Sequence, residues 1–275
     1  MRKRLFSRFR RDSVTVLRLE GVIGGMGGVG GRSLNDASLA PMIEAAFTRG
    51  KPKAVALVIN SPGGSPVQSS LIAARIRRLS EEKEIPVTAF VEDVAASGGY
   101  WLATAADEIL IDPSSIIGSI GVISASFGFH DFLARQGVER RVHTAGEDKS
   151  LLDPFRPERE EDIERLKRLQ AVIHDNFIDQ VKTRRGERLS GEKLFSGEIW
   201  VGQNGVDVGL ADGIGHLVPV MKERYGKKIR FNVQKPRRPL FRRLGLSLLS
   251  DAVETGIGRL DEQVAWSRYG LGMPR

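Results

Sequence analysis

Three short segments of the sequence combine residue types that could catalyse acyl transfer. Residues 60–65 (Asn-Ser-Pro-Gly-Gly-Ser) and residues 93–100 (Asp-Val-Ala-Ala-Ser-Gly-Gly-Tyr) each follow an apolar run, and residues 144–154 place Lys149 before two leucines and a proline. Paired glycines let backbone N–H groups point outward at an anion. Together these segments offer a serine nucleophile, donors for an oxyanion and a candidate base.

The serine of the second segment, Ser97, lies where a predicted strand leads into a helix of small residues. A hydroxyl there meets the positive end of the helix dipole, and the N–H of Gly98 can donate to an oxyanion, as in a nucleophile elbow. The same serine could serve only as the N-cap of the helix. Residues 60–65 could equally form an ordinary tight turn, and Lys149 taken alone is a solvated surface lysine.

Other catalytic chemistries find less support in the sequence. The chain has no cysteine, which excludes disulfides, thiolate metal sites and a cysteine nucleophile. A Ser/His/Asp arrangement is unsupported, because no histidine lies in a comparable turn beside a carboxylate with recognisable triad order. The four histidines are His130, His143, His174 and His216.

The pattern of apolar residues predicts an α/β fold with a largely parallel sheet, because buried strands alternate with helices. Strands are expected at residues 14–23, 53–60, 87–91, 108–111 and 121–126. Helices are expected at residues 38–49, 68–79 and 97–106, with a long amphipathic helix at 157–181. Residues 24–31 form a glycine-rich loop whose match to the dinucleotide motif G-x-G-x-x-G is attributed to chance, because no helix opens after it.

The charge distribution divides the 275-residue chain into a basic N-terminal tail (1–12), a central body (13–220) and a basic C-terminal extension (221–275) with a second amphipathic helix face from Leu246 to Val264. Their net charges are +5, −5 and +8. Basic ends suit the phosphates of anionic lipid or nucleic acid, or serve only solubility. No cleaved signal peptide and no membrane-spanning helix are expected.

Four motifs in order carry a resemblance to a known family. They are residues 60–64, residues 97–100, Gly118-Ser119-Ile120-Gly121-Val122, and residues 149–154. Over residues 14–220 the chain resembles the signal peptide peptidase A (protease IV) family in its short single-domain form. The resemblance implies a crotonase-like or Clp-protease-like ββα superhelix, with a C-terminal helical extension in this chain.

The resemblance also implies a serine endopeptidase that cleaves remnant signal peptides or other unfolded apolar segments, in a ring-shaped homo-oligomer without metal or cofactor. Ser97 would be the nucleophile and Lys149 the general base. Gly64 and Gly98 would hold the oxyanion, and Ser119 is a candidate for orienting the lysine. A lysine acts as a base only when neutral, and the neighbouring Leu151, Leu152 and Phe155 are expected to bury it.

Location and partners follow less directly from the sequence. We expect a cytoplasmic protein, with peripheral attachment to anionic membranes through its basic ends and no specific nucleic-acid partner. Family members commonly carry an N-terminal membrane anchor, whereas this chain shows only the basic dodecapeptide.

Two alternatives remain open from the sequence. A crotonase-type acyl-CoA hydratase or isomerase would keep the fold and the paired N–H groups but would need carboxylates, for which Glu92 and Asp93 are the candidates. A nonenzymatic scaffold would use the basic ends to gather anionic partners, and its serine would be unreactive.

Overall fold

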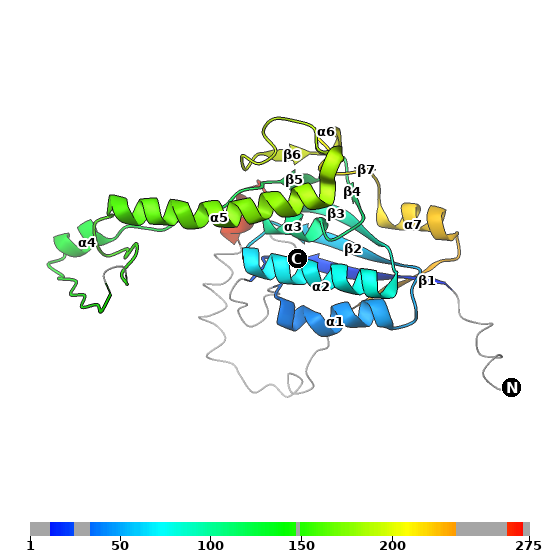
Figure 1. Cartoon of the computed structure of the whole chain (residues 1–275), viewed down its shortest axis with the longest axis horizontal. Helices are drawn as coiled ribbons and strands as arrows, with labels where there is room; N and C mark the ends of the chain where they lie inside the picture. Colours follow the sequence, from blue (N-terminus) through cyan, green and yellow to red (C-terminus); the bar gives the residue numbers. More distant parts are fainter. Residues whose placement is uncertain (1–11, 25–33, 147–148, 235–262, 272–275) are drawn as a thin grey trace. The chain divides into compact units, whose positions relative to one another are not determined.

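The computed structural model describes residues 12–24, 34–146, 149–234 and 263–271 of the chain (Figure 1). These residues form an eight-stranded sheet with the order β6-β5-β3-β2-β1-β8, in which β4 pairs with β3 and β7. The strands are β1 (Ser13–Glu20), β2 (Ala54–Ser61), β3 (Val87–Ala96), β4 (Glu108–Ile111), β5 (Ile116–Gly118), β6 (Ile199–Val201), β7 (Gly213–Ile214) and β8 (Arg230–Val233).

The sheet is parallel at every pair except β5 with β6. All eight residues of β2 are buried, as a central parallel strand covered on both faces requires. β3 is long enough to serve two neighbours, because Thr88–Val91 pair with β4 and Val94–Ala96 pair with β5. The carboxyl ends of β2, β3 and β5 therefore lie side by side, with β3 between the other two.

Helices cover both faces of the sheet. The helices of the described residues are α1 (Asp36–Thr48), α2 (Pro66–Lys83), α3 (Gly98–Ala103), α4 (His130–Arg135), α5 (Glu160–Arg185), α6 (Gln203–Asp207) and α7 (Leu217–Tyr225), with a short 3-10 turn at Gly186–Arg188. α1 and α2 pack side by side, and α1 lies against β1 (Figure 1). On the other face, Met221 of α7 packs on Val14, Ala56 and Phe90 of the sheet.

Most of the predicted elements are confirmed, and one strand is wrong. The expected strand at 121–126 has no regular structure, and the sheet is instead extended by β5 at Ile116–Gly118. The backbone turns sharply immediately after β5, because Gly118 has φ +100° and Ser119 has φ +51°. Residues 119–129 then form neither helix nor strand.

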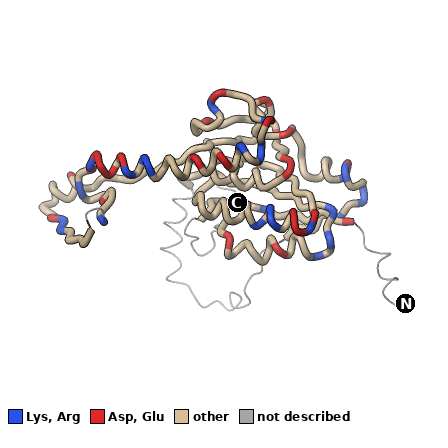
Figure 2. The backbone as a smooth tube through the Cα atoms, viewed as in Figure 1, with Lys and Arg blue, Asp and Glu red and all other residues tan. Residues whose placement is uncertain are grey.

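The chain divides into two compact units, one of residues 1–120 and 179–275 and one of Gly121–Ile178. The second unit holds α4 and most of α5, along which Lys, Arg, Asp and Glu alternate (Figure 2). The expected boundary at residue 220 falls inside α7, and β8 pairs with β1 beyond it. Residues 1–11, 25–33 and 235–262 lie outside the described residues. They include all but the first residue of the predicted glycine-rich loop (24–31) and all of the predicted apolar helix face from Leu246 to Val264 except Val264.

None of the helices within the described ranges has the length and apolar character needed to cross a bilayer.

Candidate active site at the ends of three strands

Ser97 occupies the sharp turn between β3 and α3. Its backbone adopts φ +51° and ψ −123°, a conformation that costs a non-glycine residue about 1–3 kcal/mol and that persists only where the surroundings impose it. The Ser97 N–H donates to the Gly118 carbonyl at 2.8 Å, which ties the turn to the end of β5. Ser97 is the N-cap residue of α3, but its side chain makes no capping hydrogen bond to the helix, so its hydroxyl is not engaged in capping.

The turn after β2 is fixed to both neighbouring strands by Asn60 and Ser61. The Asn60 amide donates to Asp93 Oδ2 at 2.6 Å and accepts from the Val94 N–H at 3.2 Å. The buried Ser61 hydroxyl donates to the Gly21 carbonyl at 2.7 Å and accepts from the Gly63 N–H at 3.2 Å. These contacts hold the glycine pair in place beside Ser97.

The glycines of this turn are required by close backbone approach. A Cβ on Gly63 (φ +106°) would lie 2.8 Å from the Ser97 Cβ, and a Cβ on Gly64 (φ +140°) would lie 2.1 Å from the Ile23 carbonyl oxygen. A Cβ on Gly98 would come within 3.4 Å of the Gly64 nitrogen. Within the described part of the chain, neither the Gly64 nor the Gly98 N–H donates a hydrogen bond. Both donors are therefore free to hold an oxyanion next to Ser97.

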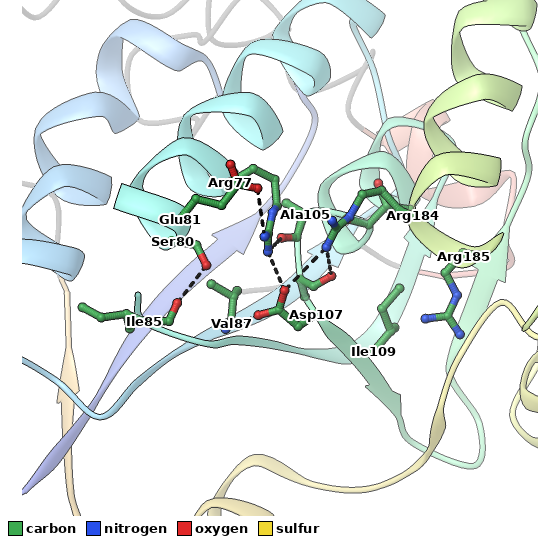
Figure 3. Close-up of polar contacts among 12 residues, drawn as sticks. Arg77, Ser80, Glu81, Ile85, Val87, Ala105, Asp107, Ile109, Arg184 and Arg185 are labelled. Atoms are coloured by element: carbon green, nitrogen blue, oxygen red, sulfur yellow. Dashed lines mark hydrogen bonds and ion pairs between the residues drawn. The ribbon is translucent and has the colours of Figure 1, made fainter. Parts of the chain in front are cut away.

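Arginines that the sequence analysis did not single out hold the far end of α3 (Figure 3). Arg184 donates to the carbonyls of Thr104 and Ala106, each at 2.9 Å, and Arg77 donates to the Ala105 carbonyl at 3.2 Å. Both arginines also approach Asp107, at 2.6 Å from Arg77 and 3.6 Å from Arg184 (Figure 3). Burial is the largest cause of the lowered pKa of Arg184, and the positive charge of Arg77 lowers it further.

A second buried contact anchors α3 to the rest of the body. Tyr100 is fully buried and donates its hydroxyl to the Leu210 carbonyl at 2.8 Å. Burial raises the pKa of Tyr100, so this hydroxyl stays protonated. Nothing in the local sequence pattern predicts this contact, because its partners lie 110 residues apart.

Lys149 lies in the other unit, Gly121–Ile178, where its side chain is exposed. Leu151 and Leu152 are half-buried, and Phe155 is 37% exposed. The described residues of this unit therefore do not bury Lys149 as the sequence analysis expected. The pairing of Lys149 with Ser97 stays a prediction.

The third strand end carries Ser119. Its N–H donates to the Glu198 carbonyl at 2.7 Å, and its hydroxyl lies 3.3 Å from the hydroxyl of Tyr269. The role of Ser119 in orienting a lysine also stays a prediction.

His216 has a carboxylate partner that the sequence did not indicate, and His130 Nε2 lies 3.1 Å from Asp131 Oδ1 in the other unit. His216 Nε2 lies 2.8 Å from Asp112 Oδ2. The Ser114 N–H, and then His216, lower the pKa of Asp112. The neighbouring Ser115 hydroxyl donates to the carbonyls of Val91 and Glu92, so it is committed to the backbone rather than to this pair.

The two carboxylates that a crotonase-type acyl-CoA hydratase would need already have partners within the chain. Glu92 pairs with Arg18 at 2.6 Å, and Asp93 accepts from Asn60. Among the residues that the structure describes, no group of three or more histidine, aspartate or glutamate side chains could hold a metal ion.

Comparison with known proteins adds independent information. The model of "Peptidase family S49" matches residues 80–227. A putative protease of Synechocystis sp. is 32% identical over 78% of this chain and 79% of its own length. A Brucella melitensis protein named Na(+)/H(+) antiporter NhaA is 49% identical over 98% of this chain, but the match spans 39% of that protein. The chain thus spans about two-fifths of the first curated relatives it matches.

One solved structure with a similar fold is a mutant of a protein named "1510-N membrane-bound stomatin-specific protease". The match covers 82% of this chain and 99% of that protein's chain, with a TM-score of 0.50 and 13% sequence identity. This likeness concerns the fold alone. Together with the helix-flanked parallel sheet and the family match, it confirms the expected α/β fold of the crotonase-like or Clp-protease-like kind.

Proposed function

The chain belongs to peptidase family S49, and from this premise we propose that it is a serine-type endopeptidase that uses Ser97 as its nucleophile and Lys149 as its general base. Its substrates are remnant signal peptides or other unfolded apolar segments. The observation that carries the proposal is the strained Ser97, whose side chain makes no capping hydrogen bond, beside two backbone N–H groups that have no partner among the described residues.

The backbone around Ser97 supports the oxyanion part of this mechanism. As Ser97 Oγ attacks the scissile carbonyl carbon, the electron pair of the C=O bond moves to oxygen, and the N–H groups of Gly64 and Gly98 stabilise that charge. Both donors are fixed before substrate arrives, because the glycine turn is tied to β1 and β3 and α3 is held at its far end. Little reorganisation is then needed during the reaction.

The lysine would move the proton. Neutral Lys149 Nζ takes the proton from Ser97 Oγ during attack and gives it to the leaving amine when the C–N bond breaks. A water molecule, deprotonated by the same lysine, then attacks the acyl-enzyme carbonyl. The ester C–O bond to Ser97 breaks, the carboxylic acid product leaves, and the lysine returns the proton to Ser97 Oγ. Ser119 would orient the lysine ammonium through its hydroxyl.

Burial of Lys149 would come from assembly. The unit that carries this lysine exposes large apolar side chains, among them Phe127 at 79% and Phe132 at 54%. A homo-oligomeric ring would cover such surfaces and shelter the active sites from folded proteins. We place this peptidase in the cytoplasm, with peripheral contact to anionic membrane through its basic ends.

Covalent labelling tests the proposed dyad. A fluorophosphonate probe should form an adduct on Ser97, mapped by mass spectrometry, and the adduct should be lost in Ser97→Ala and in Lys149→Ala. Lys167→Ala is the matched control, because Lys167 is an exposed lysine of the same unit. Wild type and control should cleave casein or apolar peptides, and the two other variants should not.

The outcomes separate the parts of the proposal. An adduct that forms in Lys149→Ala at the wild-type rate would exclude Lys149 as the base while keeping the serine mechanism. No adduct on folded wild-type protein would overturn the serine mechanism itself.

A further inference from the structure

Residues 87–107 form a closed path with Ser97 at its turn. β3 begins at Val87 and ends at Ala96, Ser97 makes the turn, and α3 leads the chain back toward Asp107. There the Asp107 N–H donates to the Val87 carbonyl at 2.8 Å, and the Val87 N–H donates to Asp107 Oδ2 at 2.9 Å. The strand, the turn and the helix therefore have to fit between two ends that are fastened together.

Two arginines from different helices hold the returning end of this path (Figure 3). Arg184, in the last turn of α5, donates to the carbonyls of Thr104 and Ala106 at 2.9 Å each. Arg77 of α2 donates to the carbonyl of Ala105, between them, at 3.2 Å. Carbonyl groups at the end of a helix lack partners within the helix, and a cation there also faces the negative end of the helix dipole. The two guanidinium groups thus bind three consecutive carbonyls that follow α3.

Asp107 joins the two arginines to the start of β3. Its Oδ1 lies 2.6 Å from Arg77 Nη1 and 3.6 Å from Arg184 Nη2, while its Oδ2 accepts the Val87 N–H. The side chains of Arg77 and Arg184 are 18% and 24% exposed, so water and salt screen these contacts only in part. Arg77, Arg184 and Asp107 together form a clamp on the end of α3 that is opposite to Ser97.

The backbone of Ser97 shows why that far end matters. A non-glycine residue keeps the conformation φ +51°, ψ −123° only where its surroundings impose it. At the turn itself, the Ser97 N–H donates to the Gly118 carbonyl, and the Trp101 N–H donates to the Ser97 carbonyl at 3.0 Å. The second contact belongs to α3 and moves with it. A shift of α3 along its axis would therefore let the Ser97 backbone relax.

We propose that Arg184 and Arg77 are positioning residues for the nucleophile: by fixing the end of α3, they keep Ser97 in its strained turn and the Gly98 N–H aimed at the oxyanion. Both act through α3 and not by contact with substrate. Arg184 contributes more, because it makes two of the three carbonyl contacts. This inference rests on the proposed function for its effect on the reaction rate, whereas the restraint on α3 does not depend on that function.

Methionine variants of the full chain test the clamp. Arg184→Met removes the donors but keeps an apolar stem, and it should slow fluorophosphonate labelling of Ser97 by about 10- to 100-fold, the range expected when a reacting group is slightly misplaced. Arg77→Met should slow labelling by about threefold, because it removes one longer contact. Tyr100 keeps its contact with the Leu210 carbonyl in both variants, so α3 is expected to remain folded.

A conservative variant and a matched control accompany them. Arg184→Lys keeps the charge and a donor, and it should recover labelling to within about threefold of wild type. Arg75→Met is the control, because Arg75 is also on α2 but binds Asp36 of α1, at 2.6 Å and 2.7 Å, rather than α3. This control should label at the wild-type rate.

Thermal melts and peptide cleavage distinguish positioning from a loss of stability. Arg184→Met should still be fully folded at the assay temperature and should cleave peptides with a lower kcat and an unchanged KM. If the slower labelling of Arg184→Met is accounted for by its unfolded fraction, or if Arg184→Lys is as slow as Arg184→Met, the arginine has a structural role only and the proposal is wrong.

Hydrogen exchange separates this inference from the peptidase mechanism. Amide exchange of residues 98–106, followed by mass spectrometry, should be about tenfold faster in Arg184→Met than in wild type and in Arg75→Met. If exchange is faster but no protein, wild type included, forms an adduct, the proposed function fails and the clamp on α3 stands. Unchanged exchange, or labelling of Arg184→Met at the wild-type rate, overturns this inference and leaves the proposed function standing.

Discussion

The two units of the chain differ sharply in how they bury their side chains. The unit with the sheet has a continuous apolar core, with Phe47, Leu57 and Tyr100 at 2% exposure or less. In the unit Gly121–Ile178, only Asp162 and Phe177 are buried among the described residues, and its remaining phenylalanines are exposed. Phe129 contacts both Phe127 and Phe155 there, and all three rings are exposed.

This difference separates the two halves of the proposed dyad. The serine half is held by a packed sheet, a glycine turn and arginine contacts, so its geometry is set by the chain itself. The lysine half lies in a unit that does not supply its own low-dielectric surroundings. We therefore expect mutations near Ser97 to act on chemistry at any protein concentration, whereas those near Lys149 should act through what covers that unit.

The largest expected contrast compares one phenylalanine from each unit. Phe47→Ala should lower the free energy of unfolding by about 3–5 kcal/mol, because it leaves a cavity in the core. Phe127→Ala should change the free energy of unfolding of the isolated chain by less than about 0.5 kcal/mol, because Phe127 is 79% exposed. Chemical denaturation of both variants at two protein concentrations measures this contrast.

The same experiment can contradict the expected difference between the two units. A loss in Phe127→Ala that grows with protein concentration would show that a second copy buries this phenylalanine. A loss of several kcal/mol at low concentration would mean that the unit has a core of its own, contrary to the exposed fractions.

The next contrast compares one glycine from each unit. Gly64→Ala should slow labelling of Ser97 by about 10²–10³-fold, since its Cβ would lie 2.1 Å from the Ile23 carbonyl and displace an oxyanion donor. Gly128→Ala should leave the rate unchanged, because nothing lies within 4 Å of its added Cβ. Labelling time courses compare the two, and near-wild-type labelling of Gly64→Ala would remove Gly64 from the oxyanion hole.

Local patterns in the sequence predicted the elements that carry the serine. The unbroken apolar run at 53–60 became β2, and the change from apolar to small residues near Ser97 marked the turn into α3. Pairs of glycines marked the close approach of the two turns. Each of these signals lies within about ten residues, which is the range over which periodicity and turn chemistry are informative.

Features that depend on distant contacts were not predictable in this way. β5 has only three residues, too few for a periodic pattern, and was expected instead at 121–126. The contacts of Arg184 with the end of α3 and the packing of Trp266 on β3 join residues more than 70 positions apart, and the contact of Arg77 with Ala105 joins residues 28 positions apart. The burial of Lys149 was inferred from neighbours in sequence, but those neighbours are themselves partly exposed.

The smallest expected effect compares two aspartates and depends on pH. Burial alone would raise the pKa of Asp212, but hydrogen bonds from Arg185 and from the Ile109 N–H outweigh it and hold that pKa below its ordinary value. A carboxyl with a lowered pKa in the folded state stabilises the fold above its unfolded pKa of about 3.9, and this stabilisation is lost as pH falls through the folded value. Asp212→Asn should therefore cost about 2 kcal/mol at pH 7 and progressively less below pH about 4.

Asp131 is the matched control from the other unit, because its side chain is 81% exposed. Asp131→Asn should leave the unfolding free energy unchanged at both pH values, as expected for an exposed carboxyl. Thermal unfolding of both variants between pH 3 and pH 7 measures the difference. If Asp212→Asn loses as much stability at pH 3 as at pH 7, packing and not the charge of Asp212 joins α5 to the sheet. The unit that carries Ser97 would then be held together by packing, and lowering the pH should leave the geometry of Ser97 unchanged.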